Sequence, residues 1–129
     1  MPKNQRKEKF STSIKPEPEV PGPHLVGRIW FEHDDLTLMS WSKATMIELI
    51  DELGSISAAA RSMKFSYAKA WRMVQELNRM GREPMVINKT GGKAGGGAMV
   101  TEEARDHARR FKELCAEFAA WLSQHSNRI

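Results

Sequence analysis

The chain has 129 residues, a formal net charge of +4 and a single cysteine. This length suits one globular domain with tails, and one cysteine excludes a disulfide framework or a cysteine-based zinc site, so we expect a reducing compartment, the cytoplasm. No stretch approaches the roughly 18 apolar residues of a membrane span, and the basic N-terminus lacks the apolar run of a secretory signal.

The positive charge is unevenly distributed along the chain. Residues 61–93 contain eight basic and two acidic residues, whereas residues 94–129 contain five of each. Such a cluster is often only a solvated face, but an excess of this size also suits a polyanionic partner.

The chain opens with a segment that is poor in apolar side chains. Residues 1–23 hold five of the six prolines, so we predict a disordered, basic tail there. The run LVGRIWFE, residues 25–32, then suits a short strand, and His33, Asp34 and Asp35 mark a turn.

Two helices are predicted next. The first is capped by Ser40 or Ser42 and stops at Gly54, because glycine readily adopts the left-handed conformation of a helix end. Its apolar residues recur at helical spacing, namely Met46, Leu49, Ile50 and Leu53. The second is a short alanine-rich helix, AAARSMK, capped by Ser57.

A third helix, capped by Ser66, is predicted over residues 66–80. Its core-facing stripe comprises Tyr67, Ala70, Val74 and Leu77. Because a turn of only a few residues joins the last two helices, they form a helix-turn-helix. After Pro84, MVINK and AMV read as two short strands. A hairpin in this place is a wing, here over residues 88–99.

The tip of that hairpin, TGGKAGGGAMVTEE, holds five of the nine glycines within seven residues. Glycine-rich loops also cradle phosphates in nucleotide enzymes, but neither GxxxxGK[ST] nor GxGxxG is complete here. Two interpretations remain: a hairpin tip without a partner, and a wing on which Lys89 and Lys93 flank backbone that can approach DNA phosphates.

The third helix offers a polar face. If its apolar stripe faces the core, Ser66, Lys69, Arg72 and Met73 point away from it, with Tyr67 at the leading edge. Hydrogen-bonding and cationic groups in the first half of a recognition helix read base edges in the major groove. Near the second helix, Ser55, Ser57 and Arg61 are candidate phosphate contacts.

A long helix is predicted after its N-cap, Thr101, with Glu102 and Glu103 favourable for the helix dipole. Its apolar stripe is continuous for over four turns. The candidate dimerisation residues in it are Phe111, Leu114, Cys115, Phe118, Trp121 and Leu122. Such a stripe either covers the chain's own core or pairs with a second copy.

Catalysis and metal binding find little support. The four histidines, His24, His33, His107 and His125, are scattered, and none lies at i+3 or i+4 from another. Cys115 lies within the apolar stripe, which favours packing over nucleophilic chemistry. We therefore predict no enzyme, no metal and no cofactor.

Three motifs together resemble a family of regulators. GSISAAA (54–60), SYAKAW (66–71) and TGGKAGGGAMVT (90–101) closely resemble the N-terminal DNA-binding domain of ModE-type molybdate-responsive transcription regulators, a winged-helix relative of the LysR DNA-binding domain. The resemblance runs from about Leu25 to the last helix. It implies a dimer that binds operator DNA of genes for molybdenum uptake and use.

That resemblance implies that the base-contacting part of the recognition helix contains Ser66, Tyr67, Lys69 and Arg72. It also implies that the wing spans residues 89–97, with Thr90 and Lys93. Full-length members continue into molybdate-binding domains, whereas this sequence stops at Ile129, so molybdate binding is not expected.

The predicted fold is mainly α with a small β component: a winged helix-turn-helix over residues 24–100 and a dimerisation helix over residues 101–129. The predicted function is a homodimeric regulator that binds double-stranded DNA. A protein-interaction module that keeps the fold without binding DNA is the alternative, and RNA binding is a third interpretation.

Overall fold

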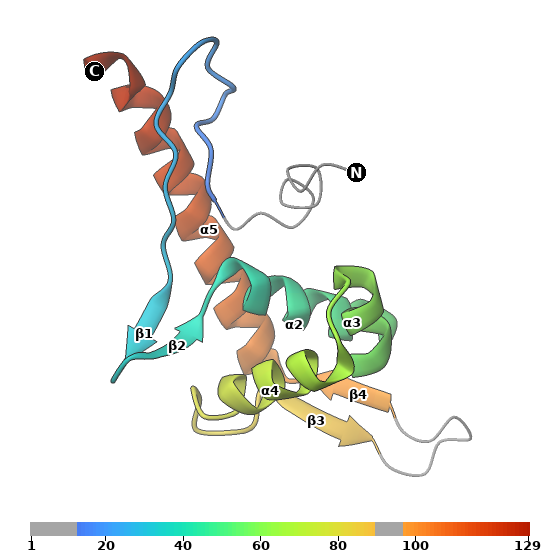
Figure 1. Cartoon of the computed structure of the whole chain (residues 1–129). Helices are drawn as coiled ribbons and strands as arrows, with labels where there is room; N and C mark the ends of the chain where they lie inside the picture. Colours follow the sequence, from blue (N-terminus) through green and yellow to red (C-terminus); the bar gives the residue numbers. More distant parts are fainter. Residues whose placement is uncertain (1–12, 90–96) are drawn as a thin grey trace.

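The computed structural model describes residues 13–89 and 97–129. It is mainly helical with a small β component, as predicted, and in the described residues that component consists of two antiparallel sheets of two strands each (Figure 1). In chain order the elements are β1 (Phe31–His33), β2 (Leu36–Met39), α2 (Trp41–Leu53), α3 (Ile56–Met63), α4 (Tyr67–Leu77), β3 (Val86–Lys89), β4 (Gly97–Val100), α5 (Glu102–His125) and a short 3₁₀ turn (Ser126–Arg128). In the described residues, no helix is long and apolar enough to cross a membrane.

Strands β1 and β2 form a tight hairpin. Asp34 and Asp35 both have positive φ, 50° and 63°, which is the conformation that a two-residue turn of type I′ requires. The predicted turn is therefore confirmed. The predicted strand over residues 25–32 is mostly wrong, because only its last two residues belong to β1, and β2 was not predicted.

Serine residues begin the three central helices. The Ser40 and Ser66 hydroxyls accept from the backbone N–H groups of Lys43 and Lys69, so those predicted caps are confirmed. The cap of α3 is Ser55 and not Ser57. The helix starts earlier than predicted because Ile56 is buried, and its side chain joins the core as the first residue of α3.

The core-facing stripe of α4 differs from the predicted one at two positions. Met73 is 7% exposed and belongs to the core, whereas Tyr67 is 54% exposed. Ala70, Val74 and Leu77 are buried as predicted. At about 100° per residue, Met73 lies on the same side as Ala70 and Leu77, while Tyr67 lies at the margin of the stripe.

Helix α5 packs against α2 at its start and against residues 13–29 further along (Figure 1). Ile14 is buried and pairs with Gly27, and the Glu17 N–H donates to the Ala119 carbonyl at 3.2 Å. A Cβ on Gly27 would lie 2.8 Å from the Phe118 ring, so glycine is needed for this approach. Residues 13–17 therefore pack against the domain, where the sequence had predicted part of a disordered tail; residues 1–12 lie outside the described residues.

The apolar stripe of α5 is divided between two environments. Phe111, Cys115 and Leu122 are buried in the chain's own core, because α2 and residues 13–29 cover that side. Leu114 and Trp121 are 55% and 50% exposed. The predicted dimerisation set is thus wrong for the three buried residues, which a second copy could not reach.

Candidate nucleic-acid interface

The helix-turn-helix and the wing gather at one end of the molecule. Figure 1 shows α3, α4 and the β3–β4 hairpin together beside the start of α5, while the C-terminal half of α5 extends away from them. Lys64, with φ 60°, caps α3 and turns the chain into α4. The arrangement presents the outer face of α4 to solvent beside the wing.

Cations on this end of the molecule lack carboxylate partners. Arg61, Lys64, Arg72 and Lys89 are exposed, and in residues 13–89 and 97–129 none of them forms an ion pair. Lys69 is also exposed, and its Nζ lies 3.9 Å from the centroid of the Phe65 ring. Such a contact holds the ammonium near the α3–α4 turn without neutralising it.

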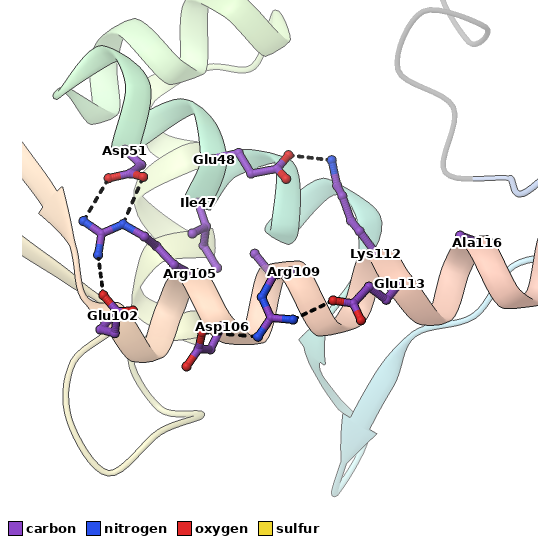
Figure 2. A pocket seen from close by; sticks show the side chains of 11 residues that line it. Ile47, Glu48, Asp51, Glu102, Arg105, Asp106, Arg109, Lys112, Glu113 and Ala116 are labelled. Carbon is purple, nitrogen blue, oxygen red and sulfur yellow. Dashed lines mark hydrogen bonds and ion pairs between the residues drawn. The ribbon is translucent and has the colours of Figure 1, made fainter.

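Three cations on the first half of α5 are arranged differently; the fourth, Arg110, is exposed and forms no ion pair within residues 13–89 and 97–129. Arg105 pairs with Asp51 at 3.1 Å, Arg109 with Glu113 at 2.6 Å and Lys112 with Glu48 at 2.6 Å. Figure 2 shows these pairs lining an open pocket between α2 and α5. Hydrogen bonding to Asp51 and attraction to its charge raise the pKa of the Arg105 guanidinium above its ordinary value. These cations are already compensated.

Two predicted serine contacts are exposed on this end. The Ser66 hydroxyl accepts from the Lys69 N–H at 3.1 Å and still has its own O–H to donate, since a hydroxyl both donates and accepts. Ser57 lies in the first turn of α3, where its hydroxyl is free of the capping role that Ser55 takes.

Both strands of the wing are anchored to the helices. Asn78, the C-cap of α4, accepts with Oδ1 from the N–H groups of Met85 and Val86, at 2.8 and 2.9 Å. On the other strand, the Ala98 N–H donates to the Gly54 carbonyl at 2.9 Å. A Cβ on Gly97 would lie 2.9 Å from that carbonyl oxygen, so glycine is required there.

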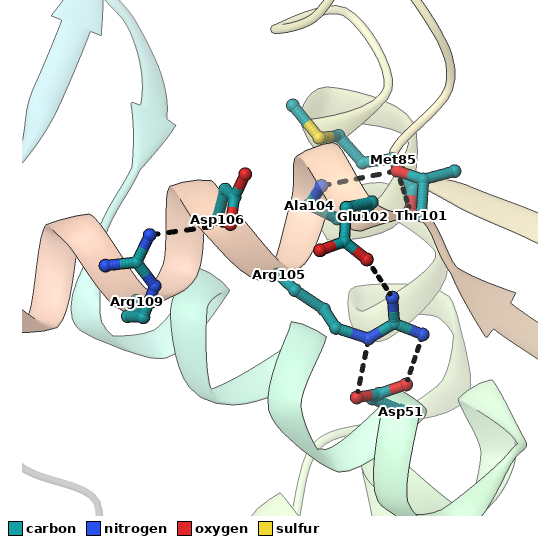
Figure 3. Close-up of polar contacts among 8 residues, drawn as sticks. All are labelled: Asp51, Met85, Thr101, Glu102, Ala104, Arg105, Asp106 and Arg109. Carbon is teal, nitrogen blue, oxygen red and sulfur yellow. Dashed lines mark hydrogen bonds and ion pairs between the residues drawn. The ribbon is translucent and has the colours of Figure 1, made fainter.

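The wing leads directly into α5. Thr101 is the N-cap, as predicted, accepting from the Ala104 N–H at 3.3 Å, and its own N–H donates to the Met85 carbonyl at 3.0 Å (Figure 3). The register pairs Lys89 with Gly97 as the last pair of the hairpin. Thr90 and Lys93 lie outside the described residues, so their placement on the wing stays a prediction.

One buried ion pair supports α4 from behind. Lys43 on α2 is 4% exposed, and its Nζ lies 3.1 Å from Glu76 Oε1 on α4. The same Nζ donates to the Thr37 carbonyl of β2. Sequence reasoning missed this pair and also Asn78. The sequence held one signal for the ion pair: Lys43 lies one helical turn before Ile47, on the side of α2 that carries apolar residues.

No cluster of three or more metal-ligating side chains occurs within residues 13–89 and 97–129. The one cysteine, Cys115, is buried, and burial raises the pKa of its thiol. A thiol held protonated in an apolar site is a poor nucleophile.

No protein-family model matches the chain. Over 105 residues, which are 81% of this chain and 39% of the relative, the chain is 30% identical to the molybdenum transport protein ModE of Azotobacter vinelandii. It is 44% identical over 85 residues to the molybdenum-pterin-binding protein MopB of Rhodobacter capsulatus, 66% of this chain and 32% of that protein. A third relative is the DNA-binding transcriptional dual regulator ModE of Escherichia coli, at 37% over 59 residues, 46% of this chain and 22% of that protein.

The chain thus spans less than two fifths of the length of these relatives. Among solved structures, a single-site mutant of ZitR from Lactococcus lactis superposes with a TM-score of 0.52 and 14% identity, covering 78% of this chain and 68% of that chain. At this identity the likeness shows the fold, which is the winged helix. The resemblance to ModE-type regulators is confirmed by the named relatives.

Proposed function

We propose that this chain is a DNA-binding transcription regulator without catalytic activity, which places α4 in the major groove and lays the wing along the backbone. The observation that carries the proposal is that, among the described residues, Lys69, Arg72 and Lys89 lie exposed on the helix-turn-helix and its wing without carboxylate partners, while Arg105, Arg109 and Lys112 on α5 are paired. Unpaired cations on a helix-turn-helix and its wing suit phosphates. Because two of the relatives are named for molybdenum transport and molybdenum-pterin binding, genes of molybdenum uptake and use are the proposed targets.

The test is the salt dependence of duplex binding. Each phosphate neutralised contributes about 0.9 to the slope of log K against log salt. A quadruple variant with Lys69, Arg72, Lys89 and Lys93 changed to alanine is expected to lose about 3.6 from that slope, if each cation neutralises one phosphate. Fluorescence anisotropy between 50 and 300 mM salt measures it.

A control variant separates local contacts from net charge. It removes four exposed cations that lie outside the helix-turn-helix and the wing, namely Lys15, Arg28, Arg110 and Arg128. It carries the same change in net charge but is expected to keep most of the slope, because long-range attraction is largely screened at these salt concentrations. Equal losses in both variants, or no duplex binding by the unmutated chain, would count against the proposed interface.

We also propose that two copies pair through the exposed part of the α5 stripe. Trp121 is half exposed and stacks on Phe118 at 6.1 Å and on His125 at 4.2 Å between ring centroids, and Leu114 lies two turns earlier. A two-fold pair would set two recognition helices about 34 Å apart, one turn of DNA. Light scattering tests this: Leu114→Glu with Trp121→Glu is expected to be a folded monomer, and a monomeric parent chain at micromolar concentration would refute pairing.

A further inference from the structure

The face of α4 that points directly away from the core is defined by its burial pattern. Ala70, Met73, Val74 and Leu77 are buried. With about 100° per residue, the opposite direction is occupied by Ala68, Arg72 and Gln75, which lie within about 40° of the line opposite Ala70. All three are exposed. Of these, the sequence indicated only Arg72 as a contact.

The chemistry of this column matches three different base edges. An arginine donates two hydrogen bonds to guanine O6 and N7, a glutamine exchanges a pair with adenine N6 and N7, and an alanine methyl contacts the C5-methyl of thymine. Ala68 is also the smallest side chain of the three and lies in the first turn of α4. A small residue there lets the helix end approach the floor of the groove closely.

The residues on either side of this column do not face directly away from the core. Tyr67 and Trp71, one turn apart, are 54% and 36% exposed along one margin. On the other margin, the Lys69 ammonium is held over the Phe65 ring, which directs it toward the α3–α4 turn and a phosphate. The base edges are therefore left to the central column.

We propose that Ala68, Arg72 and Gln75 are the base-reading residues of α4, and that each half-site contains a thymine, a guanine and an adenine that they read. This rests on the proposed function and adds its sequence specificity. From Ala68 to Gln75 the helix rises about 10.5 Å, which corresponds to roughly three base steps of 3.4 Å. The three bases therefore fall within about four consecutive base pairs.

The test starts from a duplex that the chain itself enriches from a random pool. Each thymine is then replaced by deoxyuridine, which removes only the C5-methyl. One replacement in each half-site is expected to weaken binding of the unmutated chain several-fold. The ratio of its affinities for the thymine and deoxyuridine duplexes is therefore above one, whereas for Ala68→Gly this ratio is expected to be close to one. Because the ratio is measured within one variant, partial unfolding by the added glycine cancels.

The polar members of the column are tested by base preference. Arg72→Ala and Gln75→Ala are each expected to relax the preference at one base pair by about 5- to 150-fold, the range for one bidentate contact. Lys89→Ala, the control, is expected to weaken binding to all duplexes alike. The proposal is overturned if Ala68→Gly keeps the full ratio and Gln75→Ala keeps every base preference. Salt-dependent duplex binding with no enriched sequence would overturn it and leave the proposed function standing, whereas no duplex binding would overturn both.

Discussion

The buried pair between Lys43 and Glu76 is expected to respond asymmetrically to the loss of either partner. Glu76→Leu leaves the Lys43 ammonium, whose side chain is 5% exposed, with only the Thr37 carbonyl as partner. Removing one partner of a buried pair costs about 3–5 kcal/mol, because an uncompensated charge stays inside. Lys43→Met is expected to cost less, about 1–3 kcal/mol, because the Glu76 side chain is 31% exposed and water can solvate it.

The double variant separates the pair from its surroundings. Lys43→Met with Glu76→Leu removes both charges and replaces them with apolar groups of similar size, so we expect stability within about 1 kcal/mol of the parent. Urea denaturation followed by circular dichroism gives the free energies of unfolding, provided that the transitions are two-state.

An exposed pair with short geometry is the control. Arg109 and Glu113 lie 2.6 Å apart, but their side chains are 59% and 58% exposed. Glu113→Leu is therefore expected to change stability by less than about 1 kcal/mol. The reasoning is refuted if Lys43→Met costs more than Glu76→Leu, or if the two single losses add up in the double variant.

Four further outcomes are expected. Asn78→Ala leaves the buried N–H groups of Met85 and Val86 without an acceptor and should cost about 2–4 kcal/mol in urea denaturation; a loss below about 0.5 would contradict this role. Gly97→Ala should weaken DNA binding in anisotropy assays, because the new methyl would push β4 off the Gly54 carbonyl. Burial raises the pKa of Cys115, so as pH rises the thiol ionises in the unfolded chain before it does in the folded chain. The free energy of unfolding of the parent chain, compared with that of Cys115→Ala, should therefore be constant below about pH 8.5 and fall above it, as urea titrations at several pH values would show. Molybdate should give no stoichiometric heat in calorimetry, because the pocket cations Arg105, Arg109 and Lys112 already have carboxylate partners.

Local signals made much of the fold predictable. A serine before an amphipathic run satisfies free N–H groups wherever it occurs, which is why Ser40, Ser66 and the cap Thr101 could be predicted from the sequence alone. Gly54 was predictable for the same kind of reason, since it adopts φ 72° at the end of α2. The hairpin after the helix-turn-helix followed from its flanking strands and glycine content.

Features that depend on distant segments were missed. Apolarity alone does not tell whether Tyr67 or Met73 turns inward, because that depends on where α2 and α3 lie. The packing of Ile14 on Gly27 needs a groove that only the assembled α5 creates. The partners of Lys43 and Asn78 come from other elements, so no periodicity reveals them. The DNA contacts themselves stay predictions.

The position of the wing is fixed by contacts that its two strands make with the helices. Asn78 holds β3 where that strand begins, and the Gly54 carbonyl holds β4 beside Gly97, at the last described pair of the hairpin. The α2–α3 turn and the end of α4 thus act as a rigid mount for the hairpin. We therefore expect that an exchange of the sequence between Lys89 and Gly97 leaves the mount and α4 aligned, so that affinity for the DNA backbone can be tuned independently of the bases that α4 is proposed to read.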